Sequence, residues 1–192
     1  MLGSIVMQPM LAQDKQQSGV FNRWYIGAQY GVNTKTTHND DYLGNINASA
    51  GLRFGYDITP AFGFMVEGTA FFGDVKFGAS RCFVKALNGD VLAVINLSNL
   101  FFPITGERHL FEARIFGGAG TNYIFGYPLP ENNFDQISKF GLDLGINLGS
   151  RKQWYIYLQP AINYNLDHYS RTQYNINYSA LQASIGINYR FL

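Results

Sequence analysis

The sequence has few charged residues and no long apolar run, and these two absences exclude most common architectures. Charged residues make up 14% of the 192-residue chain, whereas soluble globular proteins average roughly 25%. The absence of any uninterrupted apolar run of about 18 residues excludes a transmembrane helix. The net charge of +1 gives no indication of a nucleic-acid partner. The single cysteine, Cys82, cannot form a disulfide within the chain.

Aromatic residues and glycine are abundant instead. The chain contains 16 Phe, 13 Tyr and 21 Gly, yet its mean hydropathy is close to zero, at -0.07. In a transmembrane β-barrel, lipid-facing residues alternate with lumen residues, so the apolar positions are diluted about twofold along the chain. This composition therefore favours a β-barrel.

The C-terminal segment, residues 179–192, is the clearest strand. Its apolar residues occupy alternate positions, and the positions between them are polar, small or charged. The apolar set is Leu181, Ala183, Ile185, Ile187, Tyr189 and Phe191. This is the pattern of a membrane β-strand. The order of Gly186, Tyr189 and Phe191 also resembles the C-terminal signal that the barrel-assembly machinery recognises in its substrates, so that machinery is an expected partner.

The same alternation recurs about eight times along the chain. The expected strands are 23–33, 45–58, 62–72, 91–102, 111–125, 139–148, 154–164 and 179–192. Short connections near 59–61, 104–109 and 149–153 alternate with long ones at 34–44, 73–90, 126–137 and 165–175. Outer-membrane barrels have short periplasmic turns and long extracellular loops. We predict an all-β fold, an eight-stranded antiparallel transmembrane up-and-down β-barrel over 21–192, with both termini in the periplasm.

Residues 1–20 are excluded from this fold. The apolar stretch Leu2–Met10 and the sequence Pro9-Met10-Leu11-Ala12 resemble the end of a signal peptide, although no basic region precedes them. A disordered N-terminal tail is the alternative interpretation.

Outward aromatic residues are expected to form a girdle at the short-turn end. The set is Trp24, Phe54, Phe62, Phe64, Trp154, Tyr189 and Phe191. Rings of this kind mark the membrane interfaces of outer-membrane barrels. A water-soluble barrel is the rival architecture, but its polar face would be its surface. Here that face is rich in Gly, Asn and Ser and poor in charge, unlike most soluble surfaces.

The polar face of the strands carries balanced charges. The inward set is Arg53, Asp57, Glu67, Glu112, Arg114, Lys139, Asp143 and Arg190. An eight-stranded barrel is just wide enough to be filled by side chains, and an unpaired charge inside it is expensive. We therefore predict a lumen plugged by a charge network, and the short turn after residue 58 predicts that Arg53 pairs with Glu67. The alternative is a narrow ion or solute pore.

The sequence resembles the OmpA-like transmembrane β-barrel family, including its small OmpX- and Ail-type members. The resemblance lies in the regular succession of eight strands and in the stretches Val94–Leu100 and Phe116–Tyr123. This resemblance implies a cell-surface protein in the outer membrane of a Gram-negative bacterium. It implies little about function.

No catalytic or metal-binding motif stands out. Asp167-His168-Tyr169-Ser170 resembles the His-x-Ser of PagL-like lipid A deacylases, but no carboxylate follows to orient His168 unless Asp167 serves. A lipid A-modifying hydrolase is therefore only a second alternative. We expect no enzyme activity, no cofactor and no metal.

The longest predicted loop, 73–90, combines basic and apolar residues. The candidate contact residues are Lys76, Phe77, Arg81, Phe83 and Lys85. They suit the anionic head groups of lipopolysaccharide or a protein partner. The sequence thus predicts a monomeric integral outer-membrane barrel with a structural or surface-interaction role, in contact with outer-membrane lipid.

Overall fold

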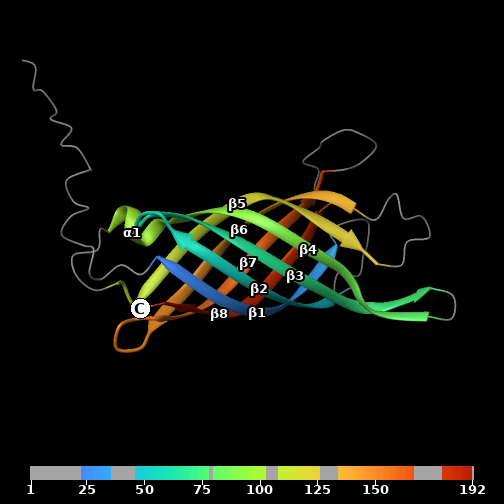
Figure 1. The fold of residues 1–192 in the computed structure, drawn as a ribbon, viewed down its shortest axis with the longest axis horizontal. Coiled ribbons are helices and arrows are strands. Elements are labelled where there is room, and N and C mark those ends of the chain that lie inside the picture. The colour runs from blue at the N-terminus through green and yellow to red at the C-terminus, as the bar shows by residue number, and fades with distance from the viewer. Residues whose placement is uncertain are drawn as a thin grey trace, which may run out of the picture.

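The strands close into a single barrel (Figure 1) in the computed structural model, which describes residues 23–35, 46–77, 80–102, 108–125, 134–166 and 179–191. In chain order the elements are β1 Trp24–Lys35, β2 Asn47–Asp57, β3 Phe62–Phe77, β4 Ser80–Asn96, α1 Leu97–Phe101, β5 Phe111–Ile124, β6 Phe134–Leu148, β7 Trp154–Asn165 and β8 Ser179–Arg190. Each strand pairs antiparallel with its sequence neighbours, and β8 pairs with β1 to close the sheet. The predicted fold class is confirmed. The N-terminal segment 1–20 lies outside the described residues.

The two faces of each strand differ in the way that the alternation predicts. In β8, Ile185 is 60% exposed, whereas its neighbour Ser184 is 2% exposed. The outer surface carries exposed Leu, Ile, Val and aromatic side chains, and the interior carries most of the buried polar and charged ones. This is the reverse of a water-soluble barrel, in which apolar side chains point inward. The molecule is therefore built for a lipid surrounding. No helix in the described part of the chain is long and apolar enough to cross a membrane.

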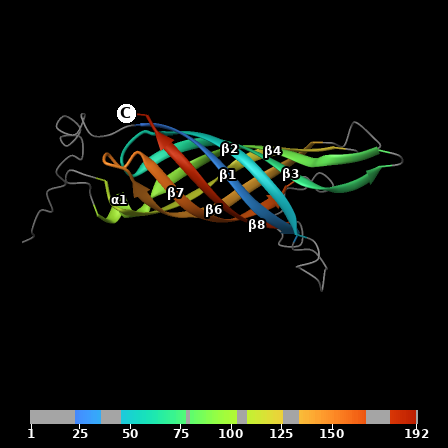
Figure 2. The same cartoon turned by 90° about the horizontal axis from the view of Figure 1, so that it is seen from below.

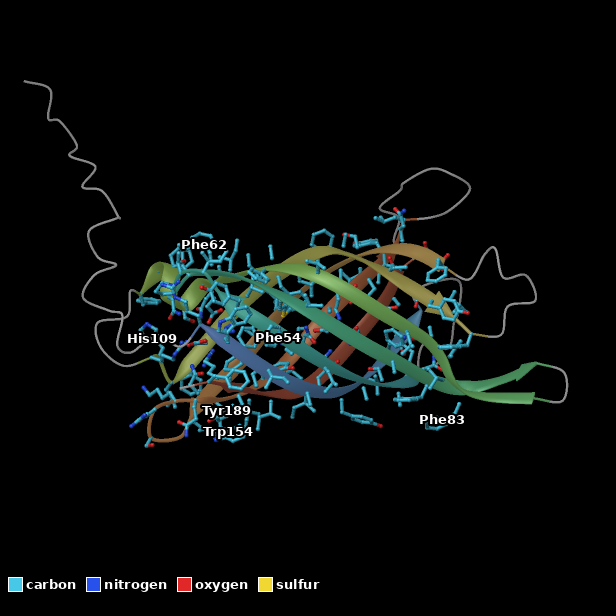
Figure 3. All side chains as sticks on the ribbon, in the orientation of Figure 1. Phe54, Phe62, Phe83, His109, Trp154 and Tyr189 are labelled. Carbon is cyan, nitrogen blue, oxygen red and sulfur yellow. The ribbon has the colours of Figure 1, made fainter. Side chains whose placement is uncertain are left out.

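Aromatic side chains from adjacent strands touch one another at the short-turn end. Trp24 lies 5.1 Å from Phe54 and 4.4 Å from Tyr56 between ring centroids. On the other side of the β1–β8 pair that closes the barrel, the Trp154 and Tyr189 rings are 4.7 Å apart. Figure 3 shows Phe54, Phe62, Trp154 and Tyr189 toward the same end of the barrel. All seven predicted girdle residues lie on the outer face, namely Trp24, Phe54, Phe62, Phe64, Trp154, Tyr189 and Phe191.

The predicted long loop 73–90 is wrong, because most of it belongs to two long strands. β3 continues to Phe77 and β4 begins at Ser80, so the two form a ribbon that extends beyond the barrel wall (Figures 1 and 2). Its polar residues suggested a loop, but 86–90 alternate between buried and exposed positions as a barrel strand does. The predicted loop 126–137 is also too long, because β6 begins at Phe134.

The predicted strand 91–102 is wrong over its second half. β4 ends at Asn96, and the short helix α1 follows. The Asn96 side chain accepts a hydrogen bond from the Asn99 backbone N–H at 3.1 Å, which caps the helix and ends the strand. The β4–β5 connection is therefore longer than the predicted turn at 104–109.

Candidate functional site

The structure places all eight predicted inward charges in the barrel lumen. Their exposed fractions run from 0% for Glu67 and Lys139 to 7% for Asp57. They come from five strands: β2, β3, β5, β6 and β8. Two groups of contacts form, one around Arg53 and one around Glu112.

Arg53 is the centre of the first group, which we call the Arg53 cluster. Its Nη2 atom lies 2.9 Å from Glu67 Oε2 and its Nη1 atom lies 2.8 Å from Asp143 Oδ2. Glu67 also binds the Lys139 ammonium, and Gln29 Oε1 accepts from Arg53 Nη2 at 2.8 Å. The predicted pairing of Arg53 with Glu67 is confirmed, since the two are direct cross-strand partners. The cluster contains two cations and two anions, so pairing offsets much of the cost of burying them.

Glu112 is the centre of the second group, which we call the Glu112 cluster. Glu112 Oε2 accepts from Arg114 Nη2 at 2.6 Å and from Arg190 Nη2 at 3.2 Å. Arg190 Nη1 also donates to Asn147 Oδ1 at 2.6 Å. Asp57 is buried close to two arginines, Arg114 of β5 and Arg108, which lies three positions before the start of β5.

Two stacked tyrosines connect the clusters. The rings of Tyr155 and Tyr157 are 5.6 Å apart and 19° from parallel. The Arg53 guanidinium lies 4.3 Å from the Tyr157 ring centroid, and the Arg114 guanidinium lies 4.7 Å from that of Tyr155. A small apolar cluster fills further space inside the barrel, formed by Tyr25, Met65, Leu92, Val94, Phe116 and Ala161. The lumen thus has charged, aromatic and apolar layers in mutual contact.

Sequence reasoning missed two buried charges, Asp90 and Arg108. Asp90 is 1% exposed and lies directly opposite Glu67 on β4. It was missed because it fell within the predicted loop, although the alternation of 86–94 could have shown it. Arg108 is 6% exposed near the start of β5. Burial lowers the pKa of its guanidinium, while Glu112 and Asp57 act in the opposite direction.

Glycine at position 186 makes room for the tyrosine layer. A Cβ atom there would lie 2.1 Å from the Tyr157 hydroxyl oxygen. We expect Gly186→Ala to lower the free energy of unfolding by about 1–3 kcal/mol through overpacking. Gly89→Ala is the matched control on the outer face, because a Cβ there meets nothing within 4 Å. Urea unfolding in lipid vesicles measures both; equal stability of the two variants would contradict the close packing at Tyr157.

The other predicted site residues lie elsewhere. Lys76, Phe77, Arg81, Phe83 and Lys85 all belong to the β3–β4 ribbon rather than to a loop. Phe83 is 76% exposed, and its ring lies 5.0 Å from that of Phe72. His168 and Ser170, of the hydrolase alternative, fall outside the described residues. Within the described ranges, no group of three His, Cys, Asp or Glu side chains is placed to hold a metal ion.

Solved structures that are similar to this fold include small barrels of the outer membrane. Neisserial surface protein A is 13% identical, with a TM-score of 0.56 over 88% of this chain and 97% of that one. The N-terminal β-barrel domain of Pseudomonas aeruginosa OprF is 10% identical, with a TM-score of 0.56 over 89% of this chain and 100% of that one. The predicted resemblance to small outer-membrane barrels is confirmed at the level of the fold. No family model matches the sequence, and no curated protein matches it.

Proposed function

We propose that this protein is an integral barrel of the bacterial outer membrane, with a structural or surface-interaction role rather than a catalytic one. The observation that carries the proposal is the filled lumen, in which the Arg53 and Glu112 clusters and the Tyr155–Tyr157 stack bridge strands on different sides of the barrel. A closed lumen leaves the two ends and the lipid face for contacts. The C-terminal strand, with the Tyr189 and Phe191 rings 5.8 Å apart, is the element that we expect the barrel-assembly machinery to recognise.

The surface role is assigned to the β3–β4 ribbon. The described pairing of β2 with β3 ends at Ser49 and Phe71, so the ribbon beyond Phe72 continues past that pairing. Lys76 and Arg81 occupy directly opposite positions in the ribbon. Both residues are cations, and Lys and Arg bind phosphate groups through charge-assisted hydrogen bonds. Anionic lipopolysaccharide head groups are therefore the contact that this ribbon suits best.

Removing both cations tests this contact. We expect the double variant Lys76→Gln, Arg81→Gln to bind lipopolysaccharide roughly a hundredfold more weakly, because two charge-assisted hydrogen bonds are lost and each contributes about 1.5 kcal/mol, or roughly a factor of ten in affinity. Arg151→Gln removes a cation from the turn at the opposite end and is expected to change nothing. Native mass spectrometry of the barrel with added lipopolysaccharide measures the bound fraction. Equal binding by all three proteins would contradict the contact.

A narrow pore is the second candidate. Asp90, Asn88 and Asn122 carry side-chain oxygens with no hydrogen-bond partner among the residues that the structure describes. Polar groups of this kind favour water inside the lumen, level with Glu67 of the Arg53 cluster at Asp90 and nearer the long-loop end at Asn88 and Asn122. The plugged barrel predicts no steady single-channel current in planar bilayers. A steady current that changes in an Asp90→Asn variant would favour the pore.

A further inference from the structure

A surface patch of Phe and Leu side chains lies at the short-turn end, on and after α1. It comprises Leu100, Phe101, Phe102, Leu110 and Phe111, and we call it the α1 patch. These five side chains are 39%, 69%, 68%, 49% and 69% exposed, in that order. None has a polar tip that could bond to water or to a lipid head group.

The short helix turns polar side chains toward the barrel and leaves apolar ones outside. Ser98 Oγ accepts from the Ala113 backbone N–H at 2.9 Å. Asn99, which is 6% exposed, donates from Nδ2 to the Pro60 carbonyl at 2.8 Å. His109 Nε2 lies 2.7 Å from the Phe102 carbonyl oxygen and so holds the segment after the helix. The exposure of the α1 patch is therefore built into the fold by specific polar contacts.

The β7–β8–β1–β2 side of the short-turn rim contains Trp and Tyr as well as Phe. The rings of Trp24 and Tyr56 are in contact, as are those of Trp154 and Tyr189, and Phe54 stacks on Trp24. Trp and Tyr suit the head-group level of a membrane, whereas Phe and Leu favour its hydrocarbon. Figures 1 and 2 agree in placing α1 across the barrel end from the C-terminus, and Figure 3 places Phe62 beside α1. The side that carries Trp and Tyr is thus suited to the head-group level, whereas the α1 patch, which consists of Phe and Leu alone, is suited to acyl chains.

Building on the proposed outer-membrane location, we propose that the α1 patch inserts among the acyl chains of the phospholipid leaflet that faces the periplasm. We call the inserted patch the membrane foot. The argument for lipid is continuity with the lipid-facing surface. Phe111 begins the outer row of β5, and Phe62 begins that of β3, which continues through Phe64 and Val66. No polar side chain on these two outer rows separates the α1 patch from the apolar, lipid-facing surface of the barrel. The foot sets this side of the barrel deeper in the membrane than the Trp and Tyr side.

Tryptophan fluorescence in vesicles with brominated acyl chains tests the foot. The probe is Phe101→Trp in a Trp24→Phe, Trp154→Phe background, and the control is Arg151→Trp in the same background, in the β6–β7 turn at the same end of the barrel. We expect the probe at position 101 to be quenched at least twofold by brominated lipid, and the probe at position 151 to be quenched by aqueous iodide instead. Quenching of position 101 by iodide alone would overturn the foot.

Quenching of the two natural tryptophans shows separately whether the barrel itself is inserted in the membrane. Trp24 and Trp154 are 45% and 41% exposed on the lipid face, so brominated lipid should quench the parent protein whether or not the foot exists. A parent that is quenched, with a position 101 probe that is not, contradicts only the foot and favours a periplasmic protein as the occupant of the patch. A third variant, Phe101→Lys, should slow insertion into vesicles severalfold if the foot is real. Unchanged insertion would also count against it.

Discussion

Replacing Arg53 with Met should lower the free energy of unfolding by about 3–5 kcal/mol, the largest single effect expected in this protein. Met keeps an unbranched, flexible side chain but has no charge, so the change removes the cation that binds both Glu67 and Asp143. Glu67 keeps Lys139 as a partner. Asp143 keeps none, because no other described side chain donates to its carboxylate. A buried carboxylate without a partner is the main cost.

The choice of second substitution makes this prediction specific. Adding Asp143→Asn to Arg53→Met removes the orphaned charge and should recover roughly half of the loss. Adding Glu67→Gln instead leaves Asp143 and Lys139 both unpaired and should recover nothing. Equilibrium unfolding of the three variants in lipid vesicles provides the comparison. Equal recovery by both second substitutions would contradict the contacts described for Asp143.

Replacing Leu144 with Arg should lower the free energy of unfolding by about 2–4 kcal/mol, because a charge near the middle of the lipid face is costly. Leu144 is 47% exposed and lies opposite Ala113 and Leu158 on the neighbouring strands. The control is Leu148→Arg, on the same face of β6. Leu148 lies opposite Trp154 in the girdle, and a charge near the interface costs only about 0–1 kcal/mol.

These two substitutions separate membrane burial from ordinary packing. Both remove a leucine of the same strand and the same face, so a packing loss alone would make them similar. The difference should appear in lipid vesicles as a lower urea midpoint for Leu144→Arg. If Leu148→Arg is equally destabilising, Leu144 does not lie nearer the middle of the membrane than Leu148, and the predicted placement of β6 in the membrane is wrong.

Most of the barrel could be predicted from the sequence because its side chains alternate with a period of two. That period assigns each residue to the lumen or to the lipid face, as with Ser184 and Ile185. The short turn before Phe62 also sets the register that brings Arg53 opposite Glu67. Local pattern was sufficient for these features, because each depends on neighbours in the chain or on adjacent strands.

Contacts across the lumen could not be predicted in the same way. Arg53 and Asp143 are 90 residues apart, and Lys139 and Glu67 are 72 residues apart. Their meeting depends on the tilt and stagger of all eight strands, which no single segment encodes. Asp90 was missed for a different reason, since a lumen-facing polar strand and a polar loop have similar compositions. Asn96 is a residue type that favours the N-cap of a helix, but the alternation around it predicts a strand that continues to residue 102, and so α1 is not predicted.

The orientation of the two faces can be measured without any substitution, by methyl NMR of the barrel in lipid nanodiscs. Leu52 and Ile185 are 67% and 60% exposed on the outer face, whereas Leu92 and Val94 are 0% and 4% exposed in the lumen. Lipids that carry a nitroxide on the acyl chain should broaden the methyl signals of Leu52 and Ile185 and leave those of Leu92 and Val94 sharp. Broadening of Leu92 and Val94 instead, or broadening of all four only by a water-soluble nitroxide, would contradict a membrane barrel with a filled lumen.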